Sequence, residues 1–113
     1  MSAISTHVLD AVRGIPASGV VVRLERIGPG EPAELGRGIT DADGRISDFG
    51  VAALPAGTYR LTFETGAYLA AAGSGEEPFF PEVAVTFRAD GVRPTYHVPL
   101  LLSPYSYSTY RGS

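Results

Sequence analysis

The feature that most constrains the fold is a series of short segments with alternating side chains, separated at close intervals by glycine and proline. The chain of 113 residues contains 14 glycines and 9 prolines, which are spread along its length. Short alternating segments bounded by turn residues are typical of β-strands. Seven or eight such strands predict an all-β sandwich of two antiparallel sheets with Greek-key connections. The segments that fit the pattern are 3–10, 20–27, 35–40, 45–47, 58–64, 81–88, 95–102 and 106–112.

One segment predicts a short helix instead of a strand. Residues 67–72 are rich in alanine and contain Tyr68 and Leu69, which we expect to anchor the helix against the core. Thr65 is expected at the N-cap, and Gly73 in the left-handed conformation that follows the last turn.

Composition excludes several classes of function. The chain has no cysteine, lysine or asparagine, which excludes disulfides, thiol and Schiff-base chemistry, and N-glycosylation. The net charge is −3 and all nine positive charges are arginines without a basic cluster, so nucleic acid is not an expected partner. No apolar run is long enough for a membrane span, and the first residues lack a secretory signal pattern. We therefore expect one cytoplasmic domain over residues 1–113, without a membrane partner.

The C-terminal segment is unusual for the end of a chain. A leucine-rich strand is broken at residues 103–104 and followed by alternating tyrosine, serine and threonine. This alternation is typical of a paired strand, so we expect a docked end that presents Tyr110, Arg111 and the carboxylate of Ser113. An edge strand without lysine or internal proline also favours pairing with a second copy of the chain.

Two histidines are the candidate proton-transfer groups. His7 and His97 each lie in a predicted strand, and their spacing alone favours strand histidines that are either hydrogen-bonded or exposed, without a catalytic role. The alternative is that both meet Arg45 and the C-terminus in one polar pocket. Imidazole accepts a proton near pH 7, and a guanidinium group can hold carbonyl oxygens and stabilise an oxyanion.

Other chemistries have weaker signals. No Gly-x-Ser-x-Gly sequence is present for a serine nucleophile, and the two histidines lack zinc-ligand spacing. Residues 41–44 resemble the start of a calcium loop, but Arg45 occupies the fifth position and no glutamate occupies the twelfth. We interpret this segment as a hairpin turn in which Gly44 has a positive φ, and we expect no metal and no cofactor.

Several blocks of sequence resemble the transthyretin family. They occur in the expected order and are similar to the N-terminal signature, the middle segment, the helix, the stretch after it and the C-terminal strands of that family; they lie at 5–17, 40–45, 65–68, 79–83 and 97–109. The ending Tyr110-Arg111-Gly112-Ser113 resembles the tetrapeptide of the family's enzymatic branch. The resemblance implies an eight-stranded sandwich with one short helix. It also implies a homotetramer of two edge-paired dimers, with active sites at the dimer–dimer interface.

The resemblance also implies a reaction, the hydrolytic ring opening of 5-hydroxyisourate to 2-oxo-4-hydroxy-4-carboxy-5-ureidoimidazoline in urate degradation. Matching motifs imply that His7, Arg45 and His97 are catalytic and that residues 110–113 bind substrate. Our hypothesis is that His97 activates water, that His7 orients it or protonates the departing nitrogen, and that Arg45 holds carbonyl oxygens. Which histidine is base and which is acid stays open.

Two alternatives remain from the same residues. One is a non-catalytic binding protein of the same family, whose carrier branch lacks both the polar residues at the histidine positions and the Tyr-Arg-Gly-Ser ending. The other is a β-sandwich module of a larger cell-surface protein, which the resemblance along nearly the whole chain makes less favourable.

Overall fold

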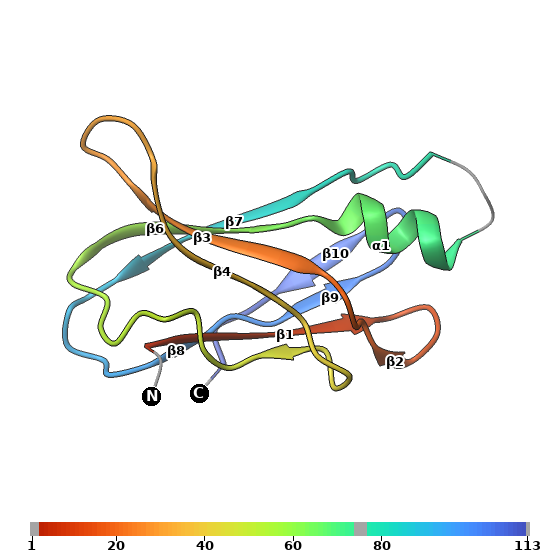
Figure 1. The fold of residues 1–113 in the computed structure, drawn as a ribbon, viewed down its shortest axis with the longest axis horizontal. Helices are drawn as coiled ribbons and strands as arrows, with labels where there is room; N and C mark the ends of the chain where they lie inside the picture. Colours follow the sequence, from red (N-terminus) through yellow and green to blue (C-terminus); the bar gives the residue numbers. More distant parts are fainter. Residues whose placement is uncertain (1–2, 74–76, 113) are drawn as a thin grey trace.

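The computed structural model describes residues 3–73 and 77–112 and contains two facing β-sheets with one helix at one end (Figure 1). Both described ends of the chain lie at the opposite end of the sandwich from the helix (Figure 1). The elements, in chain order, are β1 (Ile4–Asp10), β2 (Ile15–Pro16), β3 (Val21–Ile27), β4 (Ala33–Ile39), β5 (Arg45–Ile46), β6 (Gly57–Phe63), α1 (Thr65–Ala72), β7 (Val83–Ala89), β8 (Tyr96–His97), β9 (Leu100–Leu102) and β10 (Tyr107–Thr109).

The two sheets differ in how their strands pair. One sheet has the order β4-β3-β6-β7 and is antiparallel throughout. The other has the order β10-β9-β1-β2, with β5 and β8 also paired to β1. Here β1 runs parallel to both β8 and β9, so the prediction of two antiparallel sheets is wrong for this one. No hairpin joins β1 to β8 or β9, because the chain between them forms the sheet β4-β3-β6-β7. The relative direction of these strands is therefore not fixed locally.

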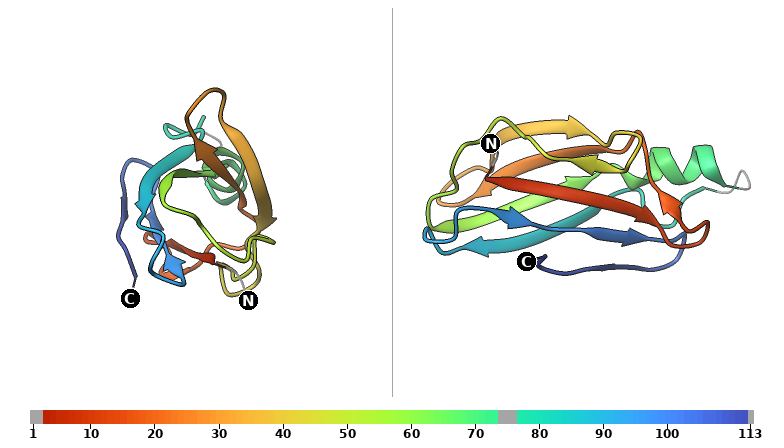
Figure 2. Two further views of the ribbon diagram at one scale, coloured as in Figure 1. Left: turned by 90° about the vertical axis from the view of Figure 1, so that its left-hand side faces the viewer. Right: turned by 90° about the horizontal axis from the view of Figure 1, so that it is seen from below.

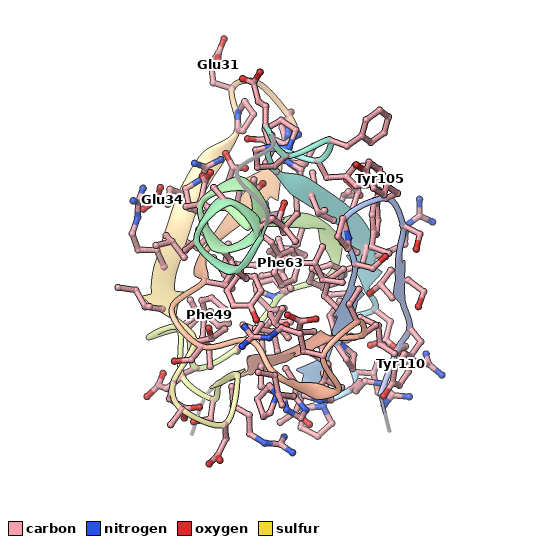
Figure 3. All side chains as sticks on the ribbon, turned by 90° about the vertical axis from the view of Figure 1, so that its right-hand side faces the viewer. Glu31, Glu34, Phe49, Phe63, Tyr105 and Tyr110 are labelled. Atoms are coloured by element: carbon pink, nitrogen blue, oxygen red, sulfur yellow. The ribbon has the colours of Figure 1, made fainter. Side chains whose placement is uncertain are left out.

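Strand alternation explains the core. Along β1 the residues alternate strictly between buried and half-buried, so that one face packs into the sandwich. The same period places Val22, Leu24, Leu61 and Phe63 inside, each without exposed surface. Figure 3 shows Phe63 between the two sheets, whereas Tyr110 lies outside on the C-terminal segment. The described part of the chain has no buried side-chain nitrogen or oxygen without a hydrogen-bond partner.

Several predicted boundaries are corrected by the structure. The strand predicted over 95–102 is two strands, β8 and β9, interrupted at Val98 and Pro99, where proline cannot donate a ladder hydrogen bond. The strand predicted over 106–112 ends at Thr109, and Gly112 makes a single further bridge to His97. Between the strands predicted at 3–10 and 20–27, β2 forms an additional two-residue strand paired with the end of β1.

The helix lies where it was predicted, but neither predicted cap forms. Thr65 is its first residue, and its hydroxyl donates to the carbonyl oxygen of Phe80 at 2.8 Å. The N–H group of Gly66 donates to the carbonyl oxygen of Pro81, so the chain returning towards β7 satisfies the first turn. Gly73 is extended, with φ −103°, and not left-handed. Tyr68 and Leu69 pack against the core as expected.

Candidate active site

Three of the predicted site residues meet on the outer face of the sheet that contains β1. The register of β1 places His7 opposite Arg45 on β5, and Ser5 opposite His97 on β8. Ser5 and His7 are two residues apart and therefore share one face of β1. Directly opposite residues on paired strands lie about 5 Å apart at their Cβ atoms. The guanidinium group and both imidazoles thus belong to one patch, although His7 and His97 are far apart in sequence.

The turn before β5 positions Arg45. The carboxylate of Asp41 accepts hydrogen bonds from the N–H groups of Asp43 and Arg45, both at 2.9 Å. Gly44 has φ +75°, as predicted, and a Cβ there would overlap the carbonyl oxygen of Val8. The turn does not connect paired strands, because β4 and β5 belong to different sheets. The predicted hairpin is therefore a crossover, which brings Arg45 to the edge of β1.

His97 is held by the start and by the end of the chain. Its ring nitrogen Nδ1 lies 2.8 Å from the hydroxyl oxygen of Ser5. Its carbonyl oxygen accepts a hydrogen bond of 2.7 Å from the N–H group of Gly112. The C-terminal segment is therefore docked beside His97, as its composition predicted.

The electrostatics of the site favour a neutral His97. Burial lowers the pKa of the His97 imidazole, and Arg45 and the neighbouring His7 lower it further, while a hydrogen bond to the Ser5 backbone opposes the shift. Hydrogen bonding from the N–H group of Arg45 lowers the pKa of the Asp41 carboxyl, so the turn keeps its negative charge beside Arg45. A neutral imidazole beside a permanent cation can accept a proton from water near pH 7.

The remaining predicted site residues divide into two groups. Gly112 joins His97, as described above. Tyr110 is 58% exposed and, with Arg111, lines a neighbouring cavity of about 220 Å³, the other side of which is formed by β7. Ser113 lies outside the described residues. Within one chain, therefore, Tyr110 and Arg111 line a cavity to which neither His7 nor Arg45 contributes.

Ser5 belongs to this site although it was not among the predicted site residues. Its signal was its position two residues before His7 on the same face of one strand. Residues 3–73 and 77–112 contain no group of three or more His, Cys, Asp or Glu side chains arranged to hold a metal ion. In the same ranges, no helix has the length and apolar character needed to span a membrane.

The fold and this patch define a class: a two-sheet β-sandwich with an imidazole and guanidinium site on the outer face of one sheet. The HIUase/Transthyretin family model matches residues 4–112, and the chain belongs to this family. It is 43% identical over 115 residues to the 5-hydroxyisourate hydrolase of Caulobacter vibrioides, with 100% of both sequences covered.

Solved structures from two branches of the family resemble the chain. The 5-hydroxyisourate hydrolase of Klebsiella pneumoniae has a TM-score of 0.85 and 45% identity, covering 100% of both chains. The transthyretin of Sparus aurata has a TM-score of 0.88 and 35% identity, covering 99% of this chain and 97% of its own. Backbone similarity alone therefore does not separate the two branches, whereas sequence identity is higher to the hydrolase.

Proposed function

We propose that this chain hydrolyses 5-hydroxyisourate to 2-oxo-4-hydroxy-4-carboxy-5-ureidoimidazoline, a step of urate degradation. The observation that carries the proposal is the convergence of His7, His97 and Arg45 on one face. This convergence occurs in a chain that is 43% identical, over its full length, to a protein named as a 5-hydroxyisourate hydrolase. Water attack on a cyclic amide needs a base, an acid and oxyanion stabilisation, and this set contains all three.

The proposed steps use only groups of this chain. Neutral His97 accepts a proton from water as the oxygen attacks the ring carbonyl carbon. The Arg45 guanidinium stabilises the negative charge that develops on the carbonyl oxygen. The carbon–nitrogen bond then breaks as the departing nitrogen receives a proton from protonated His7. The carboxylic acid formed on the attacked carbon gives its proton back to His7 and becomes a carboxylate, and His97 releases its proton to solvent. Residues 110–113 bind the substrate in this proposal, and no metal or cofactor takes part.

The open position of the site supports a proposed assembly. Arg45 is exposed, and His7 and His97 are half-buried on an outer sheet face. A partner that covers this face would exclude water and strengthen the electrostatics of the site. The edge strands β7 and β10 lie on the same side of the sandwich, with the C-terminal segment outermost (Figure 2). We propose that these edges pair two chains, and that two such dimers stack as a homotetramer with sites at the dimer–dimer interface.

The test is an ultraviolet assay of freshly generated 5-hydroxyisourate, corrected for its spontaneous decay. Arg45→Ala and His97→Ala should each lower turnover by about 100-fold or more, because general-base and oxyanion contributions are of that size. Arg37→Ala is the matched control, since Arg37 is an exposed arginine on β4 that pairs with Glu34. Near-native turnover in both site variants would show that these roles are assigned to the wrong residues.

A second arm tests the C-terminus and the cellular setting. Deletion of residues 110–113 should abolish acceleration while circular dichroism still shows the β-fold. Sedimentation of the intact protein should give four times the monomer mass of 11.9 kDa. Fractionation should recover the protein in the cytoplasm, which is part of the same proposal.

A carrier role is the second candidate, because the TM-score to a transthyretin, 0.88, exceeds the TM-score to the hydrolase, 0.85. It predicts a folded assembly that binds an aromatic ligand without accelerating ring opening. Absence of acceleration by the folded wild-type assembly would favour this candidate.

A further inference from the structure

The imidazole of His97 is contacted on two sides, by Ser5 of β1 and by Gly112 of the C-terminal segment. Ser5 Oγ lies 2.8 Å from Nδ1 on one side. On the other side, Gly112 approaches so closely that a Cβ built there would lie 2.7 Å from His97 Cδ2 and 3.2 Å from Cγ. The two contacts come from β1 and from the end of the chain, so they restrain the ring independently.

We propose that Ser5 and Gly112 are positioning residues that hold the His97 ring with its proton on Nδ1 and with Nε2 as the nitrogen that accepts a proton from water. This inference rests on the proposed function for its kinetic consequences only, because the protonation state of the ring can be measured without substrate.

A neutral imidazole carries one proton on one of its two nitrogens. The Ser5 hydroxyl, 2.8 Å from Nδ1, can accept a hydrogen bond from Nδ1–H or donate one to an unprotonated Nδ1. If Nδ1–H donates to Ser5 Oγ, the lone pair on Nε2 is free. Nε2 is also the only ring nitrogen not engaged by Ser5, so water must be activated there. The proton taken from water then gives an imidazolium that keeps its bond to Ser5.

Gly112 restrains the ring sterically. A Cβ contact below 3 Å is not sustained in proteins, so any side chain at 112 must displace either the ring or the C-terminal segment. The hydrogen bond of 2.7 Å from Gly112 N–H to His97 O ties the segment to the same residue. The glycine in the Tyr-Arg-Gly-Ser ending is therefore required by the approach to the ring, independently of any contact with substrate.

The charged surroundings make the Ser5 bond visible in a pH profile. Arg45 on β5 and His7 on β1 face His97, and Arg111 precedes the contacting glycine in the C-terminal segment. All three are cations or potential cations, whereas a hydrogen bond to the Ser5 backbone favours the charged ring and is kept in Ser5→Ala. A hydroxyl accepts a stronger hydrogen bond from a charged ring than from a neutral one, so Ser5→Ala should lower the pKa of His97 and move the acid limb of kcat/KM to lower pH.

The kinetic experiment compares Ser5→Ala, Ser5→Thr and the control Ser18→Ala, which changes an exposed turn residue. Ser5→Ala should lower kcat by about 10- to 100-fold with little change in KM, because the loss is one of orientation and not of binding. Ser5→Thr keeps a hydroxyl on a strand and should restore most of the rate. Unchanged kcat in Ser5→Ala, or loss without rescue by threonine, would overturn the role of Ser5.

The structural experiment is nitrogen-15 NMR of the histidine rings in the intact wild-type protein. We expect the Nδ1–H form of His97 near pH 8, and we expect Gly112→Ala to shift the His97 signals while Gly57→Ala does not. An added Cβ at Gly57 would meet no atom closer than the flexible guanidinium of Arg26, at 3.4 Å, which is an ordinary contact. A ring protonated on Nε2 in the wild type would overturn the inference even if the enzyme is active. Conversely, the expected tautomer in an inactive protein would refute only the proposed function.

Discussion

The strongest stability prediction concerns a hydrogen bond that ties the helix to the strand carrying the site. The hydroxyl of Tyr68 on α1 donates to Asp10 Oδ2 at 2.8 Å. The other carboxylate oxygen of Asp10 accepts N–H groups from Val12 and Arg13, at 3.1 and 3.0 Å. Asp10 is only 6% exposed. Tyr68→Phe therefore leaves a nearly buried carboxylate oxygen without its donor while keeping the ring that packs on the core.

The size of the effect follows from the charge on the acceptor. Hydrogen bonds to charged groups contribute about 1.5–3 kcal/mol, and neutral ones about 1 kcal/mol. We expect Tyr68→Phe to lower the free energy of unfolding by about 2 kcal/mol at pH 7. Tyr59→Phe is the matched control, since the Tyr59 hydroxyl donates at 2.6 Å to a neutral acceptor, the carbonyl oxygen of Pro55. That variant should lose about 1 kcal/mol.

The two variants should also differ in their pH dependence. Burial alone would raise the pKa of Asp10, but hydrogen bonds from Arg13 N–H, Tyr68 OH and Val12 N–H outweigh it, and the net direction is downward. A carboxyl whose folded pKa is depressed stabilises the fold above its unfolded value of about 3.9, and this contribution is lost as the pH falls through the folded pKa. The cost of Tyr68→Phe should therefore shrink below about pH 4, while that of Tyr59→Phe should not.

The assay is urea denaturation at fixed protein concentration and at pH 7, 5 and 3. With slopes of about 1–3 kcal/mol per molar urea, a loss of 2 kcal/mol moves the midpoint by about 1 M. A cost for Tyr68→Phe that is the same at every pH, or no larger than that of Tyr59→Phe, would refute the charged hydrogen bond as its cause.

Three further predictions test the site and the core. Arg45→Ala removes a positive charge that lowers the pKa of His97, so the pKa of the imidazole should rise in an NMR titration, and an unchanged value would contradict the proximity of the two groups. Leu61→Ala should cost about 2–5 kcal/mol in chemical denaturation, because Leu61 has no exposed surface, and a cost below 1 kcal/mol would contradict tight packing there. Gly44→Ala should lower both stability and turnover, since its Cβ would overlap a carbonyl oxygen of β1 beside Arg45. Gly50→Ala has the same positive φ but open space, so it should affect stability alone.

Strand positions were predictable because the alternation of apolar and polar residues within each strand indicates which side chains are buried. In β1, β3, β6 and β7 the apolar period of two directly reflects which face is buried, and the predicted and observed ranges agree within a residue or two. The helix was predictable from its alanines for the same reason. Its caps were not, because the groups that satisfy its first turn come from Phe80 and Pro81, beyond the helix in the chain.

Pairing between distant strands was not predictable from local patterns. No residue in β1 or β8 indicates that they run parallel, since their relative direction depends on the path of the whole chain between them. For this reason the sequence favoured two separate strand histidines on spacing alone, and the convergence of His7 with His97 depended on a family resemblance. The strand register explains why these residues lie close together, because it places Ser5 opposite His97 and His7 opposite Arg45.

The three consecutive residues Ser5, Thr6 and His7 show how closely the fold and the candidate site depend on the same strand register. Thr6 points inward, is 1% exposed, and donates a hydrogen bond of 2.6 Å to the carbonyl oxygen of Val98, in the gap between β8 and β9. That bond holds from the inside the same segment whose His97 is held by Ser5 from the outside. A slip of one residue along β1 would exchange the two faces, which would bury His7 and expose the apolar residues. Packing of the inner face in the core therefore fixes which residues of β1 point toward the site. Substitutions that weaken the inner face of β1 should reduce turnover before the protein unfolds.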